Sequence, residues 1–185
     1  MLVNIQDVQK VRPIAANMNA KDRLEPYLME AESLRLMDAI GAPLYRFLDA
    51  YNNEDDTEYT RPDGVTVTLT NEQYHALMYG GYYTLGNCGD KYAPGIVYAI
   101  SYIAYARFLV NNPINITAFG VRYKDGEFSS RVEDNAIVRA SNDAQRIGEA
   151  YLEQVVEMCA AYDLLPCKQY TEAPRHIVRI GQKKL

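Results

Sequence analysis

The chain has no tryptophan, two histidines and three cysteines among its 185 residues. Cys88, Cys159 and Cys167 are odd in number, irregularly spaced and form no CxxC pair. Free thiols in a reducing compartment are therefore expected, not a disulfide framework. His75 and His176 have no partners at zinc-ligand spacing, which argues against a metal site. No Cys–His pair lies close together in the sequence, so a cysteine nucleophile has little support.

A positive net charge, long apolar runs and the motifs of common enzymes are also missing. The formal net charge of −5 argues against broad, non-specific nucleic-acid binding. No run is long and apolar enough for a membrane span, and the N-terminus lacks the pattern of a signal peptide. No P-loop, dinucleotide fingerprint, GxSxG or HExxH motif occurs. These absences favour a non-enzymatic protein made in the cytoplasm, and we assign it no catalytic, cofactor-binding or metal-binding residue.

Tyrosine, by contrast, is abundant, with sixteen copies. The stretch GIVYAISYIAYARFLVNN, from Gly95 to Asn112, predicts a helix without a polar face. Such a helix must be covered all round, so it is either the central helix of a domain or one that meets another subunit. Tyr98, Tyr102 and Tyr105 form one stripe along it. Because tyrosine is enriched at protein interfaces, we predict that these three residues are interface residues.

Apolar spacing predicts further helices in the N-terminal part of the chain. Residues 2–14 are expected to form a short helix, and a longer helix begins near Lys21. Gly41 suits a helix C-cap in the left-handed region, and Pro43 suits the first turn of the next helix. The buried stripe of the longer helix is expected at Leu24, Leu28, Ala31, Leu34 and Met37.

The middle of the chain mixes turns with short regular elements. Residues 52–70 are an acidic, polar insert in which the turn RPDG and the alternation of residues 65–70 predict a strand or hairpin. A capping box from Thr70 to Gln73 predicts a helix over 71–79. We expect a loop over 86–95 and an extended segment over 114–121.

A long last helix and a basic tail complete the pattern. The helix is predicted from Ser130 to about Leu165, with a bend allowed by Ser141-Asn142-Asp143 and Gly148. The fold class is therefore mainly α: a helical bundle with a long C-terminal helix, a small β-hairpin or strand element and an extended C-terminal arm. One helical domain is expected over 1–166 and the arm over 167–185. Contact residues in the arm are predicted at Arg175, Ile177, Arg179, Lys183 and Lys184.

Four sequence features, taken in order, resemble the head–tail connector (adaptor, neck) proteins of tailed phages and prophages. They are an amphipathic helix followed by IGAPLYRFL, the helix and strand YAISYIAYARFLVNNPINITAFGV, the helix start SSRVEDN and the terminal segment AYLEQVVEMCAAYDLL. The chain looks closest to uncharacterised connector-like proteins of phages that infect gut Bacteroidetes. Small adaptors are typically shorter, and the acidic insert and basic tail depart from them.

The resemblance implies a mainly helical virion protein that forms a ring below the portal and joins it to the tail. It implies no cofactor, and it implies a homo-oligomer whose partners are portal and tail proteins. DNA would pass through the ring's channel without specific binding, which an acidic lumen favours. The alternative is a small-ligand-binding or regulatory helical protein with a tyrosine-lined pocket. A hydrolase with a dispersed site is the least supported reading.

Overall fold

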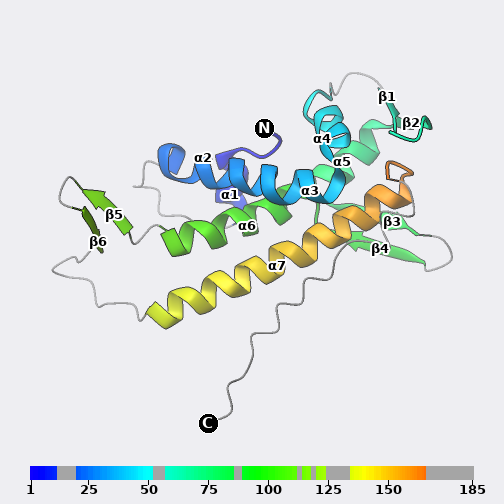
Figure 1. Cartoon of the computed structure of the whole chain (residues 1–185). Helices are drawn as coiled ribbons and strands as arrows, with labels where there is room; N and C mark the ends of the chain where they lie inside the picture. The colour runs from blue at the N-terminus through cyan, green and yellow to red at the C-terminus, as the bar shows by residue number, and fades with distance from the viewer. Residues whose placement is uncertain are drawn as a thin grey trace, which may run out of the picture.

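The structure of the protein is a computed structural model. The structure describes residues 1–11, 20–51, 57–85, 89–111, 114–117, 120–123 and 134–165. Within these ranges the fold is mainly α, as predicted, with a long C-terminal helix and small antiparallel hairpins. Helix α6 (Ile96–Asn111) lies at the centre, between α2 (Ala20–Ala31) and α7 (Asp134–Ala161) (Figure 1). The predicted arm, residues 167–185, lies outside the described residues.

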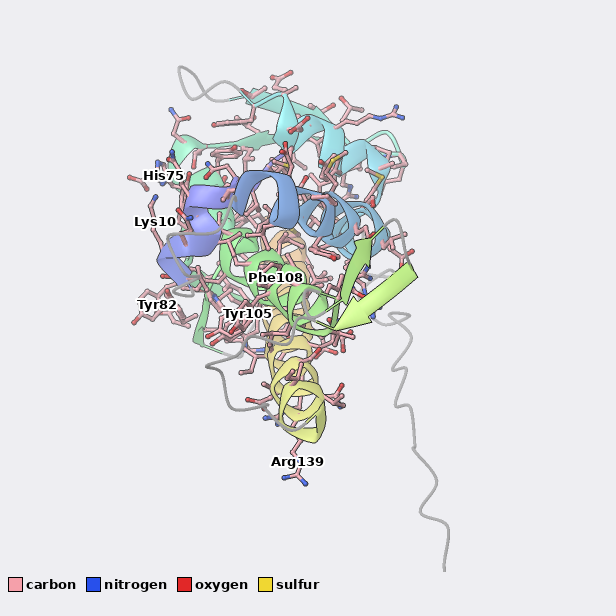
Figure 2. The ribbon with its side chains drawn as sticks, turned by 90° about the vertical axis from the view of Figure 1, so that its left-hand side faces the viewer. Lys10, His75, Tyr82, Tyr105, Phe108 and Arg139 are labelled. Atoms are coloured by element: carbon pink, nitrogen blue, oxygen red, sulfur yellow. The ribbon has the colours of Figure 1, made fainter. Side chains whose placement is uncertain are left out.

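The predicted short N-terminal helix is confirmed as α1 (Ile5–Val11). Its start is fixed by a reciprocal pair of bonds, in which the Asp7 amide donates to Asn4 Oδ1 and the Asn4 amide donates to Asp7 Oδ2. Val3 and Val8 are fully buried. Lys10 projects from the surface near the chain's start (Figure 2). α1 therefore packs its apolar side against α6 and α2.

The longer N-terminal helix contains a π-helical segment that moves its buried face. It runs as α2, the π segment η1 (Glu32–Leu36) and α3 (Met37–Ile40). The prediction that Leu34 is buried is wrong, because Leu34 is 56% exposed and Leu36 is buried instead. Buried positions recur every four residues here. On a regular α-helix, residues at this spacing move gradually around the helix axis and away from the buried face. A π-helix has more residues per turn, so the π segment keeps these residues closer to that face. The buried positions of this series are Leu24, Leu28, Glu32, Leu36 and Ile40, and the predicted Ala31 is buried beside them.

Gly41 separates α3 from α4 (Ala42–Asp49). Its φ of +82° confirms that the position favours glycine, but its ψ of 148° is extended, so the predicted left-handed cap is wrong in that detail. The Gly41 amide donates to the carbonyl of Met37, and the Gly41 carbonyl accepts from the amide of Tyr45. Pro43 stands in the first turn of α4, as predicted.

The hairpin and the helix predicted from the polar insert are both present. β1 (Thr57–Thr60) pairs antiparallel with β2 (Thr66–Leu69), with Tyr59 opposite Val67. The predicted capping box opens α5 (Asn71–Tyr79), since Thr70 Oγ1 accepts from the Gln73 amide and Gln73 Oε1 accepts from the Thr70 amide. Residues 52–56 of the insert lie outside the described residues.

The prediction of a loop over 86–95 is wrong for its second half. Residues Asp90–Ala93 form β4, which pairs antiparallel with β3 (Gly81–Thr84). The strands are only four residues each, and polar residues and glycines surround them, so they gave no alternating pattern long enough to recognise. The extended segment after α6 is confirmed as β5 (Ile114–Thr117), which pairs with β6 (Gly120–Tyr123).

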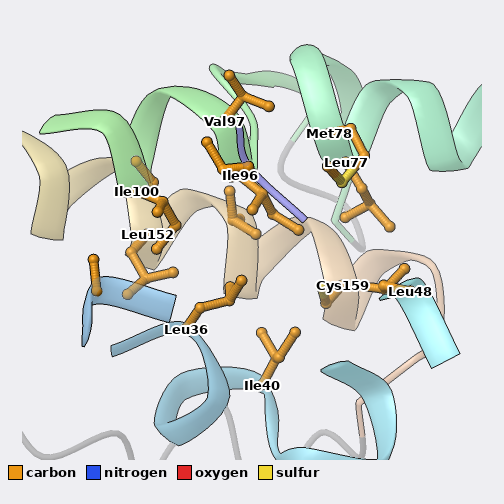
Figure 3. Close-up of a cluster of buried hydrophobic side chains, with 14 of the residues drawn as sticks. Leu36, Ile40, Leu48, Leu77, Met78, Ile96, Val97, Ile100, Leu152 and Cys159 are labelled. Carbon is orange, nitrogen blue, oxygen red and sulfur yellow. The ribbon is translucent and has the colours of Figure 1, made fainter. Parts of the chain in front are cut away.

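Helix α7 runs without interruption past the residues that were expected to permit a bend. Its end at Ala161 precedes the predicted end, because residues 162–165 form turns. The predicted start at Ser130 lies outside the described residues. α7 packs along α6, and both helices contribute to one buried apolar cluster that also includes α3, α4 and α5. Figure 3 shows Leu36 and Ile40 on one side of this cluster, with Leu152 and Cys159 opposite them.

Candidate interaction surface

Helix α6 is covered on most of its circumference, as its composition requires. Ala99, Ile103 and Ala106 face α7, and Ile96 and Ile100 are fully buried. The predicted tyrosine stripe is the less covered side of the helix. The sequence left open whether this helix is central or meets another subunit. The structure places it centrally, with its tyrosines toward the outside.

The three predicted tyrosines are not equivalent. Tyr98 is exposed, whereas Tyr102 and Tyr105 are partly buried. The ring of Tyr102 meets that of Tyr151 from α7 edge-on, with centroids 5.6 Å apart and planes at 89°. Tyr98 is thus the member of the stripe with the most surface available to a partner.

Two further exposed tyrosines come from the β3–β4 hairpin, which the sequence did not predict. Tyr82 and Tyr92 are directly opposite each other across the strands, and their ring centroids are 5.3 Å apart. Tyr82 projects from the edge of the molecule (Figure 2). Strand residues alternate between faces, so the neighbouring Tyr83 is buried. The hairpin therefore presents a pair of tyrosines outward and anchors itself with a third.

The anchor of the hairpin is a carboxylate on α7. Tyr83 Oη and Lys91 Nζ each donate to Glu157 Oε2, at 2.8 Å in both cases. Glu157 is partly buried, which strengthens its bond to the phenol and its ion pair with the lysine relative to fully exposed equivalents. The hairpin is thereby fixed to the C-terminal half of α7, and Tyr82 and Tyr92 are held on a rigid support.

Close backbone contacts join the hairpin to the neighbouring helices. A Cβ built on Gly95 would lie 2.5 Å from the Gly80 amide nitrogen, and one built on Gly80 would lie 2.8 Å from Tyr92 Oη. Both glycines have positive φ angles. The end of α5, the hairpin and the start of α6 consequently meet at one place. We call the exposed tyrosines of these three elements the tyrosine surface: Tyr79, Tyr82, Tyr92 and Tyr98, which are 49%, 75%, 53% and 41% exposed.

A second aromatic cluster joins α4 and α5 to the β1–β2 hairpin, and its rings are buried or partly buried. Tyr51 stacks on Tyr74 at 4.1 Å, and Phe47 contacts Tyr59 at 4.9 Å between ring centroids. Arg61 Nη1 donates to the carbonyl of Asp163 at 2.9 Å, which ties the β1–β2 hairpin to the end of α7. Both hairpins are therefore fastened to the same end of α7, but only β3–β4 carries exposed tyrosines.

Chemically reactive groups do not gather anywhere on the described part of the chain. His75 is exposed and its ring lies 5.2 Å from that of Tyr79. Cys159 is fully buried, and burial raises the pKa of its thiol to about 12. Across residues 1–11, 20–51, 57–85, 89–111, 114–117, 120–123 and 134–165, no group of three His, Cys, Asp or Glu could hold a metal ion. The predicted contact residues Arg175, Ile177, Arg179, Lys183 and Lys184, together with Cys88, Cys167 and His176, lie outside the described residues.

None of the helices in those described ranges is long and apolar enough to cross a membrane.

The sequence model of a protein family described as a family of unknown function (DUF6712) matches residues 49–164. The chain belongs to this family. The DUF6712 match begins at the last residue of α4 and ends within the turns after α7, so it contains the hairpins β1–β2 and β3–β4 and the central pair α6 and α7. All four residues of the tyrosine surface lie inside this span. Tyr79 is at the end of α5, Tyr82 and Tyr92 are on the β3–β4 hairpin, and Tyr98 is on α6. Neither the search of curated proteins nor the search of solved structures gave a match.

Proposed function

We propose that this protein is a non-enzymatic virion structural protein, a head–tail connector that forms a ring between portal and tail. The observation that carries the proposal is the tyrosine surface, which presents Tyr79, Tyr82, Tyr92 and Tyr98 on elements fixed to α7. Exposed tyrosines held in place lose little conformational entropy on binding, and they supply both apolar area and hydrogen bonds. A surface of this kind suits stable contact between subunits.

The overall charge supports the same role. A ring through which DNA passes must not retain the DNA, and an acidic protein with a formal net charge of −5 repels the phosphate backbone. The sequence resemblance to connectors supports the proposal as well, and it covers the elements from the amphipathic helix and IGAPLYRFL through the apolar α6 to the long α7. Homo-oligomerisation, portal and tail partners, and location in the virion all belong to this proposal.

The basic tail extends the proposal to a second contact. Residues 167–185 carry Arg175, Arg179, Lys183 and Lys184, whereas the whole chain is acidic. We assign them to an arm that docks on a neighbouring subunit or on the portal. A chain truncated after Pro166 is expected to fold with an unchanged melting temperature and to lose assembly. Retention of folding, assembly and phage infectivity together would show that the arm has no such role.

The connector role is tested in the virus. The gene is deleted from the phage or prophage that carries it, and particles are examined by electron microscopy and by mass spectrometry of purified virions. The proposal expects wild-type virions to contain the protein and deletion lysates to contain separate DNA-filled heads and tails. Complete infectious particles without the protein would overturn it.

A further inference from the structure

The outward face of the β3–β4 hairpin combines two aromatic rings with one carboxylate. In the register of the hairpin Tyr82 is opposite Tyr92 and Thr84 is opposite Asp90, and all four residues are exposed. Residues two apart in a strand share a face, so Asp90 lies on the same face as both rings. Thr84 Oγ1 donates to Asp90 Oδ1 at 2.6 Å, which orients the carboxylate. Aromatic rings beside a carboxylate are groups that bind a basic side chain.

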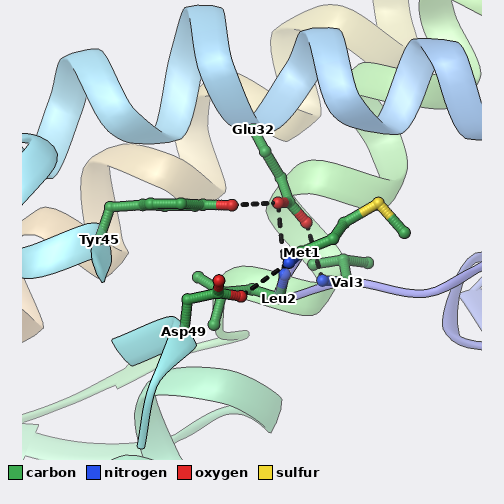
Figure 4. A network of polar contacts seen from close by, with 6 residues as sticks. All are labelled: Met1, Leu2, Val3, Glu32, Tyr45 and Asp49. Atoms are coloured by element: carbon green, nitrogen blue, oxygen red, sulfur yellow. Dashed lines mark hydrogen bonds and ion pairs between the residues drawn. The ribbon is translucent and has the colours of Figure 1, made fainter. Parts of the chain in front are cut away.

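Two carboxylates elsewhere in the protein are already occupied by internal donors. Glu32 is 3% exposed and accepts hydrogen bonds from two backbone amides and from Tyr45 Oη (Figure 4). Asp49 pairs with the terminal amine of Met1 at 2.7 Å (Figure 4). Asp90, by contrast, is exposed and has no cationic partner among the residues that the structure describes. Its charge is therefore open to a cation from outside the described fold.

The size of the tyrosine surface suits a peptide segment better than a second folded domain. Its four tyrosines are between 41% and 75% exposed. A tyrosine side chain covers about 150–250 Å² when it is buried, so the four together offer roughly 300–500 Å². Each partner in a stable interface between folded proteins contributes about 800 Å². The exposed tyrosines alone are too small for such an interface, but they are large enough for one segment laid across the rings.

The basic tail has the complementary chemistry. Residues 167–185 carry five basic residues against the single acid Glu172, in a chain whose formal net charge is −5. Arg175, Ile177 and Arg179 are spaced two apart, so an extended peptide of this sequence carries all three on one face. Arginine stacks on aromatic rings and pairs with carboxylates, and isoleucine adds apolar contact.

We propose that the tyrosine surface of one copy binds the basic tail of a neighbouring copy. A closed ring needs a contact between two different patches of each subunit, and the tail and the tyrosine surface form such a pair. The inference rests on the proposed assembly role, and it names the surface that receives the arm.

The length of the tail permits this contact between copies. The last described residue, Leu165, follows the end of α7. The ten residues from there to Arg175 span at most about 35 Å when extended. A domain of this size has a radius of gyration of about 15 Å. The tail is therefore long enough to leave its own subunit and reach the next one.

Two full-length variants test the contact by complementation. The donor variant keeps the tail and carries Tyr82→Ser and Tyr92→Ser. The receptor variant keeps the tyrosine surface and carries four substitutions in the tail: Arg175→Gln, Arg179→Gln, Lys183→Gln and Lys184→Gln. Sedimentation velocity is expected to show a monomer for each variant alone and a dimer with one copy of each in their mixture, because only one contact can then form. Added salt is expected to dissociate that dimer.

Each other result contradicts the proposal. Association of the receptor variant with itself would mean that tyrosine surfaces bind one another. Association of the donor variant with itself, or a mixture without dimers, would mean that the tail binds elsewhere, such as on its own subunit or on the portal. The connector role is judged separately by the composition of virions, so its failure is distinguishable from the failure of this contact.

Asp90→Asn tests the carboxylate while all the tyrosines stay in place. Added to the receptor variant, it is expected to weaken the dimer about two- to fivefold, which is the effect of losing an exposed ion pair. Asp38→Asn changes an exposed aspartate on α3 and is the matched control. It is expected to leave the dissociation constant unchanged. Equal affinity of the Asp90→Asn receptor and its parent would contradict the placement of the tail on this face of the hairpin.

Discussion

Gly148 of α7 lies so close to Ile103 of α6 that a Cβ at position 148 would come within 2.6 Å of Ile103 Cγ1. The same Cβ would lie 3.0 Å from the carbonyl oxygen of Ala99. Two turns away, Ser141 Oγ donates to the carbonyl oxygen of Ala106 at 2.8 Å. Ser141 and Gly148, which are poor helix formers, are therefore the residues through which α7 approaches the central helix α6.

Replacement of Gly148 by alanine is expected to destabilise the protein, although alanine is the better helix former. Helix propensity alone would add about 1 kcal/mol of stability. The methyl group must displace the side chain of Ile103 and crowd the backbone of α6 at Ala99, and overpacking of this kind costs about 1–3 kcal/mol. The difference is a net loss of up to about 2 kcal/mol, which denaturant unfolding would measure.

Asn142→Ala, on the exposed side of α7, is the control for this prediction. It is expected to gain about 0.5 kcal/mol from propensity alone. If Gly148→Ala also gained stability, the close contact between α6 and α7 would be wrong.

Two buried serines on the facing helices should respond to alanine in opposite directions. Ser101 Oγ is the one buried side-chain polar atom of the described residues without a hydrogen-bond partner, whereas Ser141 Oγ is bonded. Ser101→Ala removes an unsatisfied hydroxyl and is expected to stabilise the protein by roughly 0.5–2 kcal/mol. Ser141→Ala is expected to cost about 0.5–1 kcal/mol. Calorimetric melts of both variants check the signs, and a loss of stability in Ser101→Ala would mean that its hydroxyl has a partner.

Local signals in the sequence were sufficient for much of the fold. The capping box at Thr70 and Gln73 and the turn RPDG specify their elements through nearby residues, and both predictions are confirmed. The all-round apolar composition of α6 correctly required a covered helix. The π segment could not be foreseen, because it depends on the tertiary demand that both Glu32 and Leu36 be buried, and Leu34 was misplaced for that reason.

Only part of the tyrosine surface could be predicted from the sequence. Helical spacing pointed to Tyr98, but Tyr82 and Tyr92 become neighbours only through the pairing of β3 with β4. The anchor of that hairpin, Glu157, is distant in sequence from both strands. The one available signal was the recurrence of tyrosine on both sides of residues 86–89, which is a weak indication of cross-strand pairing.

The thiol of Cys159 should be unreactive while the protein is folded. Its raised pKa of about 12 means that the fold favours the neutral thiol, so this contribution to stability is present below the ordinary thiol pKa and lost as the pH rises toward about 12. With Cys88 and Cys167 replaced by serine, a disulfide reagent at pH 8 is expected to label Cys159 only after denaturant is added. Fast labelling of the folded protein would show that the residue is accessible.

Mass photometry of the protein, alone and mixed with the portal protein of the same phage, tests the central claim most directly. The compared samples are the wild type, the double variant Tyr82→Ser/Tyr92→Ser, and Val65→Ser, which changes an exposed residue on the other hairpin. The account predicts multi-copy assemblies for the wild type and Val65→Ser, and monomers with an unchanged melting temperature for the double variant. A wild type that stays monomeric and never binds portal, or a double variant that assembles as well as the wild type, would contradict it.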